Sequence, residues 1–197
     1  QPYEIGCVLV KNAIAMHNTF SMNPEYLKDS KEEAGEINFY NYGIQLTRRF
    51  RALKLYMSLK TFGLNAFREA VQYNFNMCDR VQQRLESRSD LWEVVSPSQL
   101  AVINFRINPQ SVNLPEDKLN QLNQRLSKEM VASGDAMLAT TVLKGKTVLR
   151  MCLINPRTTE DDVLGTIEQL ETWVNEYFIE LGINTRANRT DSPTVSL

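Results

Sequence analysis

The chain has 197 residues and a mass of 22.6 kDa; 43% of its residues are hydrophobic and 23% are charged, which fits one globular domain or one domain with part of another. Its 22 basic and 23 acidic residues give a formal net charge of -1, so no basic field favours nucleic acid as a partner. The longest apolar runs, such as residues 7–10, are too short to span a bilayer, which argues against a membrane protein.

The first third of the chain predicts one strand, a long irregular segment and a helix. Residues 6–10 (GCVLV) are apolar and rich in β-branched side chains, which is typical of a buried strand. Residues 11–43 show no amphipathic period, and a connection of this length is usually a lid, a binding loop or a mobile segment. Helical spacing follows over residues 48–59, and Gly63 is a natural stop for that helix.

A second helix, over residues 65–87, carries one apolar stripe and links this part to a region of paired strands and helices. That region reads strand, strand, helix, strand, strand, helix, in the order 91–95, 100–107, 115–133, 138–143, 147–154 and 158–182. The order predicts a small α+β layer over residues 90–182, with helices on one face of a mostly antiparallel sheet. The tail, residues 183–197, is polar, and we expect it to be frayed.

Four side chains are candidates for chemistry, and each has a plainer interpretation. Tyr26, in the long segment, is a packing residue or a phenol acid on a closing lid. Thr47 precedes a helix and is either a simple N-cap or part of an anion site. Arg150 interrupts an apolar strand and needs a structural or a ligand carboxylate as partner. His17 has no second histidine or cysteine nearby, which favours an exposed or locally bonded side chain.

Cysteine and histidine usage argues against several kinds of site. The three cysteines, at positions 7, 78 and 152, are far apart and odd in number, which is unlike a disulfide framework or a zinc site and fits a reducing cytoplasm. A single histidine argues against His-based triads and multi-histidine metal sites. We expect no metal site in this chain.

Several segments resemble the pyridoxal-phosphate-dependent group II amino-acid decarboxylases. The most specific is residues 42–63, YGIQLTRRFRALKLYMSLKTFG. Residues 1–7 (QPYEIGC) resemble the segment just after the family's His-Lys-Trp motif, and residues 23–27 (NPEYL) resemble its mobile catalytic loop. Residues 148–151 (VLRM) with 155–156 (NP) resemble its C-terminal strand. The similarity covers essentially residues 1–182.

The resemblance implies the C-terminal part of an α/β, fold-type I enzyme that uses pyridoxal 5′-phosphate and forms an obligate homodimer. Residues 1–63 would end the large cofactor domain, with the mobile catalytic loop at about 18–43. Residues 64–89 would be a linking helix, and residues 90–182 the small α+β domain. The lysine that binds the cofactor as a Schiff base would lie about four residues before Gln1, so we expect the chain to continue a longer polypeptide upstream.

The family pattern also implies roles for individual residues. Tyr26 takes the place of the loop tyrosine that protonates Cα after CO2 has left. Thr47 matches the position that reaches the cofactor phosphate, from the neighbouring subunit. Tyr3 matches a residue that lines the substrate pocket. Arg150 matches an arginine that meets a substrate carboxylate in the glutamate decarboxylase branch and is structural in others.

Two classes of function remain open. One is decarboxylation of an L-amino acid to its amine, with an aromatic substrate slightly favoured and this chain supplying the lid, the small domain and part of the cofactor site. The other is a non-catalytic dimerisation or regulatory module derived from the same fold. A His-Lys-Trp motif upstream of Gln1 would distinguish the enzyme.

Overall fold

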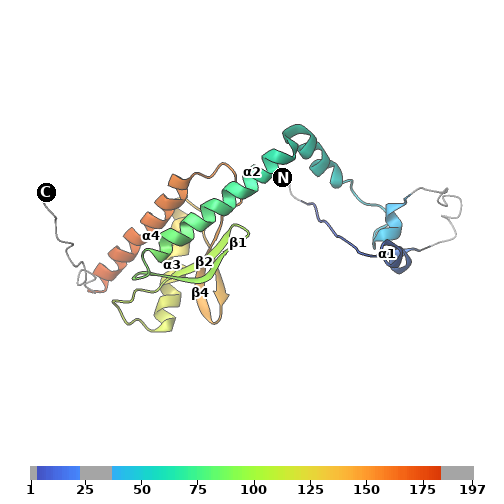
Figure 1. Cartoon of the computed structure of the whole chain (residues 1–197). Helices are drawn as coiled ribbons and strands as arrows, with labels where there is room; N and C mark the ends of the chain where they lie inside the picture. Colours follow the sequence, from blue (N-terminus) through green and yellow to red (C-terminus); the bar gives the residue numbers. More distant parts are fainter. Residues whose placement is uncertain (1–3, 23–36, 183–197) are drawn as a thin grey trace. The chain divides into compact units, whose positions relative to one another are not determined.

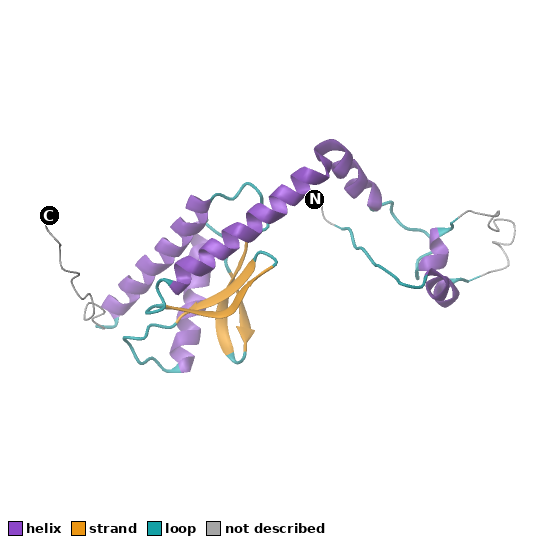
Figure 2. Ribbon diagram, viewed as in Figure 1, coloured by secondary structure: helices purple, strands orange, loops and turns teal. Residues whose placement is uncertain are grey.

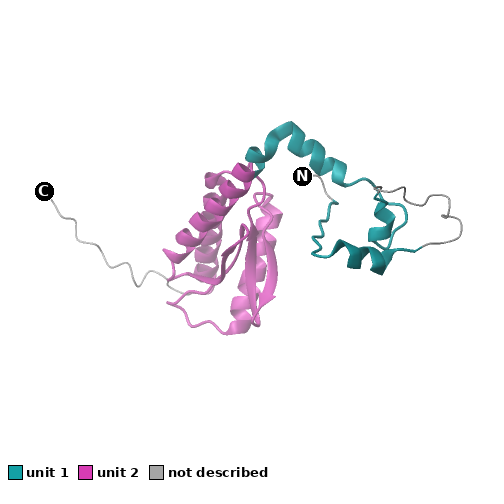
Figure 3. Cartoon of the chain, turned by 45° about the vertical axis from the view of Figure 1, so that its right-hand side comes forward, with its two compact units in different colours: residues 1–67 teal, residues 68–197 magenta. Residues whose placement is uncertain are grey.

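The structure is a computed structural model that describes residues 4–22 and 37–182; residues 1–3, 23–36 and 183–197 lie outside the described part (Figure 1). The chain divides into two compact units, residues 1–67 and 68–197 (Figure 3). No helix in the described ranges is both long and apolar enough to cross a membrane. In chain order the elements are α1 (Ala13–Phe20), the 3₁₀ helix η2 (Phe39–Tyr42), α2 (Ala52–Glu86), β1 (Trp92–Gln99), β2 (Val102–Ile107), α3 (Glu116–Ser133), β3 (Ala139–Leu143), β4 (Lys146–Cys152) and α4 (Glu160–Glu180).

The second unit is a four-stranded sheet packed against helices (Figure 2). The strand order is β1-β2-β4-β3 and every neighbouring pair is antiparallel, so the predicted order of strands and helices and the antiparallel sheet are confirmed. Alternate residues of the central strands enter one core with apolar side chains of the later part of α2, of α3 and of α4. The core residues contributed by β2 and β4 are Ile103, Phe105, Ile107, Leu149 and Met151.

Local signals in the sequence set several element ends. Thr159 caps α4, where its side chain accepts the Asp162 N–H and the Asp162 carboxylate accepts the Thr159 N–H. Gly134 ends α3 in the left-handed conformation, at φ 81°. The β3–β4 hairpin turns at Lys144 and Gly145, which both have positive φ. A two-residue turn needs this conformation because it must match the right-handed twist of the two strands that it joins.

One strand boundary differs from the prediction. The sequence Ser-Pro-Ser at 96–98 suggested a break, but β1 continues through it to Gln99, with irregular register after Val94. Proline is tolerated there because β1 is an edge strand and its open side needs no donor. The turn lies instead at Leu100 and Ala101, which both have positive φ.

Two asparagines of α3 replace strand pairing where β2 and β4 separate. The β2–β4 ladder ends at Phe105 and Leu149. Beyond it, the Asn123 side chain accepts the Ile107 N–H at 2.8 Å and donates to the Ile107 carbonyl at 3.1 Å. The Thr147 N–H donates to the Asn120 side chain at 2.7 Å. The backbone groups left over by the ladder are thereby satisfied, as burial demands.

The described part of the first unit has little core, and two predictions for it were wrong. Residues 6–10 are not a buried strand: they are exposed, Leu9 by 94%, since none of the described residues pairs with them. The segment predicted to be irregular contains α1, which Asn12 caps by accepting the Ala15 N–H at 3.0 Å. The short helix has no buried residue, so it left no apolar period to detect.

The prediction that one helix stops at Gly63 and another follows it is confirmed. Gly63 interrupts α2 at φ 78° and ψ 157°, a conformation that glycine adopts without a steric penalty. The part that follows places Met77, Cys78, Val81 and Leu85 in the core of the second unit.

Candidate functional site

The sequence-predicted site residues fall in separate parts of the chain. Tyr3 and Tyr26 lie outside the described residues. Thr47 belongs to the first unit and Arg150 to the second, so the surroundings of each are described within its own unit.

Thr47 is not a helix N-cap, because α2 begins only at Ala52. The Leu53 N–H bonds to the Phe50 carbonyl at 3.2 Å as the helix starts, and Thr47 lies in an exposed bend well before it. The sequence favours a cap because Thr47 precedes a pattern of helical spacing that begins at Arg48. The preceding residues take a non-helical path instead.

The exposed segment around Thr47 has donors that suit a phosphate. Its hydroxyl is followed by Arg48 and Arg49, both exposed and neither ion-paired to any residue in the described ranges. Arg48 also lies against the backbone of Gly43, where an added Cβ would come within 3.2 Å of its Nη1. A hydroxyl and two guanidinium groups, carried by three consecutive residues, are donors of the kind that phosphates prefer. The residues therefore fit a phosphate-bearing cofactor.

Arg150 lies on the face of the sheet opposite the core. It alternates with Leu149 and Met151, which face the core, and its own side chain is exposed. The register places Arg150 opposite Asn104 of β2 on one side and Ala139 of β3 on the other. No carboxylate in the described part of the chain pairs with it, so the structural partner considered from sequence is not found there.

Asn104 is the second polar side chain on this stretch of the sheet. Its Oδ1 is buried and has no hydrogen-bond partner among the described residues. On its other side the register places Ser96 of β1. Ser96, Asn104, Arg150 and Ala139 thus form one cross-strand row, in which two small residues flank an amide and a guanidinium. This set is called the Arg150 row below.

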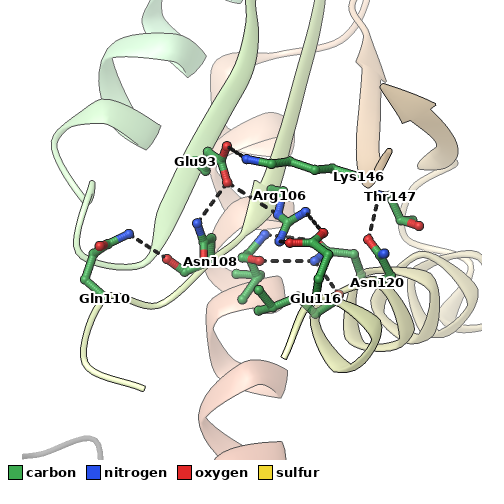
Figure 4. A network of polar contacts seen from close by, with 11 residues as sticks. Glu93, Arg106, Asn108, Gln110, Glu116, Asn120, Lys146 and Thr147 are labelled. Atoms are coloured by element: carbon green, nitrogen blue, oxygen red, sulfur yellow. Dashed lines mark hydrogen bonds and ion pairs between the residues drawn. The ribbon is translucent and has the colours of Figure 1, made fainter. Parts of the chain in front are cut away.

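A neighbouring group of charged residues on the same face is ion-paired internally, although the buried Arg106 Nε has no hydrogen-bond partner among the described residues (Figure 4). Arg106, fully buried, donates to both carboxylate oxygens of Glu116, at 2.6 and 3.2 Å. Its Nε lies 3.5 Å from the Glu93 carboxylate, which also accepts from Lys146 at 2.5 Å and from Asn108 at 2.8 Å. Two cations and two carboxylates balance, so this network holds β1, β2, β4 and the start of α3 together and offers no free charge.

Arg106 was not singled out from the sequence, although the signal that marked Arg150 was present. It too is an arginine inside an apolar strand, within VINFRI. The bond from Arg106 holds the pKa of the Glu116 carboxyl below its ordinary value of 4.5. The two arginines therefore differ in environment: Arg106 is buried and paired, whereas Arg150 is exposed and unpaired within the described chain.

His17 takes part in a local packing contact. It lies in the last turn of α1 and meets Tyr42 edge to face, with ring centroids 5.5 Å apart. This agrees with the locally bonded interpretation and gives the histidine no metal or catalytic partner among the described residues.

Comparison with known proteins identifies the family. Residues 2–108, more than half of the chain, match the model of the pyridoxal-dependent decarboxylase conserved domain. An aromatic-L-amino-acid decarboxylase of Bacillus atrophaeus is 44% identical over 180 residues, which are 91% of this chain and 37% of that protein. A phenylacetaldehyde synthase of Arabidopsis thaliana is 31% identical over 162 residues, 82% of this chain and 32% of that protein.

Solved structures give the same relationship. The crystal structure of Oryza sativa TDC with PLP and tryptamine matches 82% of this chain and 33% of its own, at a TM-score of 0.71 and 28% identity. The predicted fold class is therefore confirmed: the fold is that of the C-terminal part of a fold-type I enzyme. The chain spans about a third of the length of the relatives it matches.

Proposed function

The chain belongs to the pyridoxal-dependent decarboxylase family, and from that premise we propose that it is part of an enzyme that converts an L-amino acid to its amine and CO2. The match over residues 2–108, together with 44% identity to an aromatic-L-amino-acid decarboxylase, is the observation that carries the proposal. An aromatic side chain is the favoured substrate class, since the similar relatives include aromatic, tyrosine and tryptophan decarboxylases.

The cofactor of this family, pyridoxal phosphate, supplies the electron sink that lets the α-carboxylate leave as CO2. Thr47, with Arg48 and Arg49 beside it, would hold the phosphate through its hydroxyl and their guanidinium groups. Tyr3 would line the substrate pocket. Tyr26 would deliver a proton to Cα, so that the product is an amine. Arg150 would meet a carboxylate group of the bound amino acid.

The remaining parts of the proposal concern assembly and location. The lysine that binds the cofactor would belong to a segment upstream of Gln1, and Thr47 would serve the site of the neighbouring subunit in a homodimer. The described first unit exposes many large apolar side chains, which is expected of a surface that a larger assembly covers. Three free cysteines support a reducing cytoplasm as the location.

The first test locates the cofactor. The complete protein, saturated with pyridoxal phosphate and reduced with borohydride, should yield one lysine peptide that carries the cofactor and lies outside residues 1–197. The same preparation should release CO2 and amine from an aromatic amino acid. Cofactor on no lysine, together with no CO2, would leave the alternative, a non-catalytic dimerisation or regulatory module, as the better description.

A further inference from the structure

We infer that Asn104 is a binding residue that acts with Arg150: its side-chain amide and the Arg150 guanidinium together receive the carboxylate of the amino acid. The inference rests on the proposed function, because it assigns the carboxylate to this face of the sheet. It adds a second residue, from the neighbouring central strand, to the single arginine that the sequence suggested.

The first step is the unused hydrogen-bonding capacity of Asn104. None of its side-chain atoms bonds to a residue in the described ranges, and its Oδ1 is buried without a partner. A buried polar atom left unpaired costs the folded state free energy, and a β-branched residue would suit the middle of a central strand better. The fold of the second unit alone therefore gives no reason for an asparagine at this position.

The second step is the contrast with three other asparagines, which bond to the sheet or to its side chains. Asn123 and Asn120 complete the backbone pairing of β2 and β4, and Asn108 binds the Glu93 carboxylate. Each of these three has a structural task that can be identified, whereas Asn74 of α2, like Asn104, has a buried Oδ1 with no partner among the described residues. Asn104 has none, and its cross-strand neighbour Arg150 also lacks a partner in the described chain.

The third step is geometry. Asn104 and Arg150 are directly paired across β2 and β4, so their side chains rise from the same face only one strand spacing apart. Ser96 and Ala139, at the two ends of the row, are small residues. The amide can turn to present its NH2 beside the guanidinium, and the two then offer donors to both oxygens of one carboxylate.

The fourth step is charge. The other basic side chains of this face, Arg106 and Lys146, are already bound to Glu93 and Glu116. The charges of Arg106 and Lys146 are therefore compensated. Arg150 carries the uncompensated positive charge that attracts an approaching anion. A carboxylate is thereby directed to the row and away from the paired network.

The test separates carboxylate recognition from general binding. The complete, cofactor-saturated protein is titrated with two competitive ligands that share an aromatic body: an arylpropionate, which has the carboxylate and no amine, and an arylethylamine, which has the amine and no carboxylate. Asn104→Val should weaken arylpropionate binding about five- to tenfold, the effect of one lost hydrogen bond to a charged group. It should leave arylethylamine binding within twofold. Thr141→Val, which makes a polar-to-apolar change on the same face outside the row, should change neither.

A double variant tests whether Asn104 and Arg150 act together. In Arg150→Met, which keeps the aliphatic stem, adding Asn104→Val should weaken arylpropionate binding less than twofold further, because the two donors serve one carboxylate. Equal weakening of both ligands, or the same loss with and without Arg150, would refute the inference. An enzyme that decarboxylates normally while Asn104→Val has no effect refutes only this inference. A protein that binds the cofactor but releases no CO2 refutes the proposed function. The arylpropionate titration would still measure whether the Arg150 row binds a carboxylate.

Discussion

We propose that the outcome of the reaction depends on Tyr26. A phenol delivers a proton to carbon faster and more selectively than water does, and phenylalanine cannot replace it. We expect Tyr26→Phe to leave folding and cofactor content unchanged while amine formation falls roughly a hundredfold or more. Without that proton the product should shift to aldehyde, ammonia and peroxide in the presence of oxygen. Steady-state assays of amine and peroxide on both proteins test this, and an unchanged rate of amine formation would show that Tyr26 is not the acid.

We expect Glu116 to make the stability of the second unit depend on pH. Because the bond from Arg106 lowers the pKa of Glu116 in the folded state, folding favours the carboxylate. The resulting stabilisation is present above the ordinary carboxyl value of 4.5 and is lost as the pH falls through the lower, folded-state value. Glu116→Gln should therefore reduce the free energy of unfolding at pH 7 and cost progressively less as the protein is acidified toward pH ~3.

The measurement is urea denaturation of both proteins across that pH range. Glu69→Gln, a charge removal on an exposed stretch of α2, is the control and should not reproduce the pH dependence. A loss of stability that is the same at pH 7 and in acid would mean that Glu116 contributes through packing and not through its charge.

Single charged residues in apolar strands could be detected from the sequence, but their environments could not. Arg106 and Arg150 give the same local pattern, yet one is fully buried and the other exposed. The difference depends on Glu116 and Glu93, which are ten and thirteen residues from Arg106 and reach it only once α3 and β1 are in place. Thr47 failed as a cap for a related reason, since the path of the backbone at residues 47–51 is not determined by residue type alone.

Among the elements, α3 acts on the sheet through Asn123 as well as through apolar packing. Its side chain is fully buried and bonds to both backbone groups of Ile107 and to the Leu119 carbonyl. Asn123→Ala would leave the Ile107 N–H and carbonyl unpaired in the interior, so we expect the free energy of unfolding to fall by about 3 kcal/mol. Chemical denaturation measures it. Asn123→Asp, which would bury an unpaired carboxylate against the Ile107 and Leu119 carbonyls, should cost at least as much; no loss in either variant would mean that water replaces the amide.

Gly63 gives a prediction about helix continuity. At φ 78° and ψ 157° its backbone lies in a region that other residues strongly avoid. No side chain blocks a Cβ there, so only backbone strain opposes Gly63→Ala. We expect this variant either to lose about 1–3 kcal/mol of stability or to relax into one continuous helix, with higher helicity by circular dichroism. Unchanged stability together with unchanged helicity would contradict the strained geometry.

Elements with strong local signals could be predicted, and those that depend on remote partners could not. Local residue types explain three features: the capping box at Thr159, the left-handed conformation of Gly134 and the turn at Lys144–Gly145. These signals allow α3, α4 and the β3–β4 hairpin to be predicted from the sequence. Residues 6–10 have strand composition but no pairing partner among the described residues, and composition alone cannot form a strand.

At the scale of the whole molecule, the two units differ in how much of their stability is their own. Among the described residues, the apolar core lies between Met77 and Phe178, in the second unit, and the only buried residue of the first unit is Asn41. Large apolar side chains of the first unit, including Leu9, Ile44 and Phe50, are exposed. Such a surface is stable only when something else covers it.

We therefore expect residues 64–182, which begin after the interruption at Gly63, to fold as an isolated fragment with one cooperative urea transition. The fragment keeps the whole core and the Arg106 network, and its buried apolar area should give a normal denaturant dependence. Residues 1–63 alone should show no cooperative transition and should bind hydrophobic dyes. If the short fragment folds alone, or if residues 64–182 unfold without cooperativity, the assignment of stability to the second unit is wrong. The part of the chain that carries Thr47 would then be stable before the rest of the protein covers it.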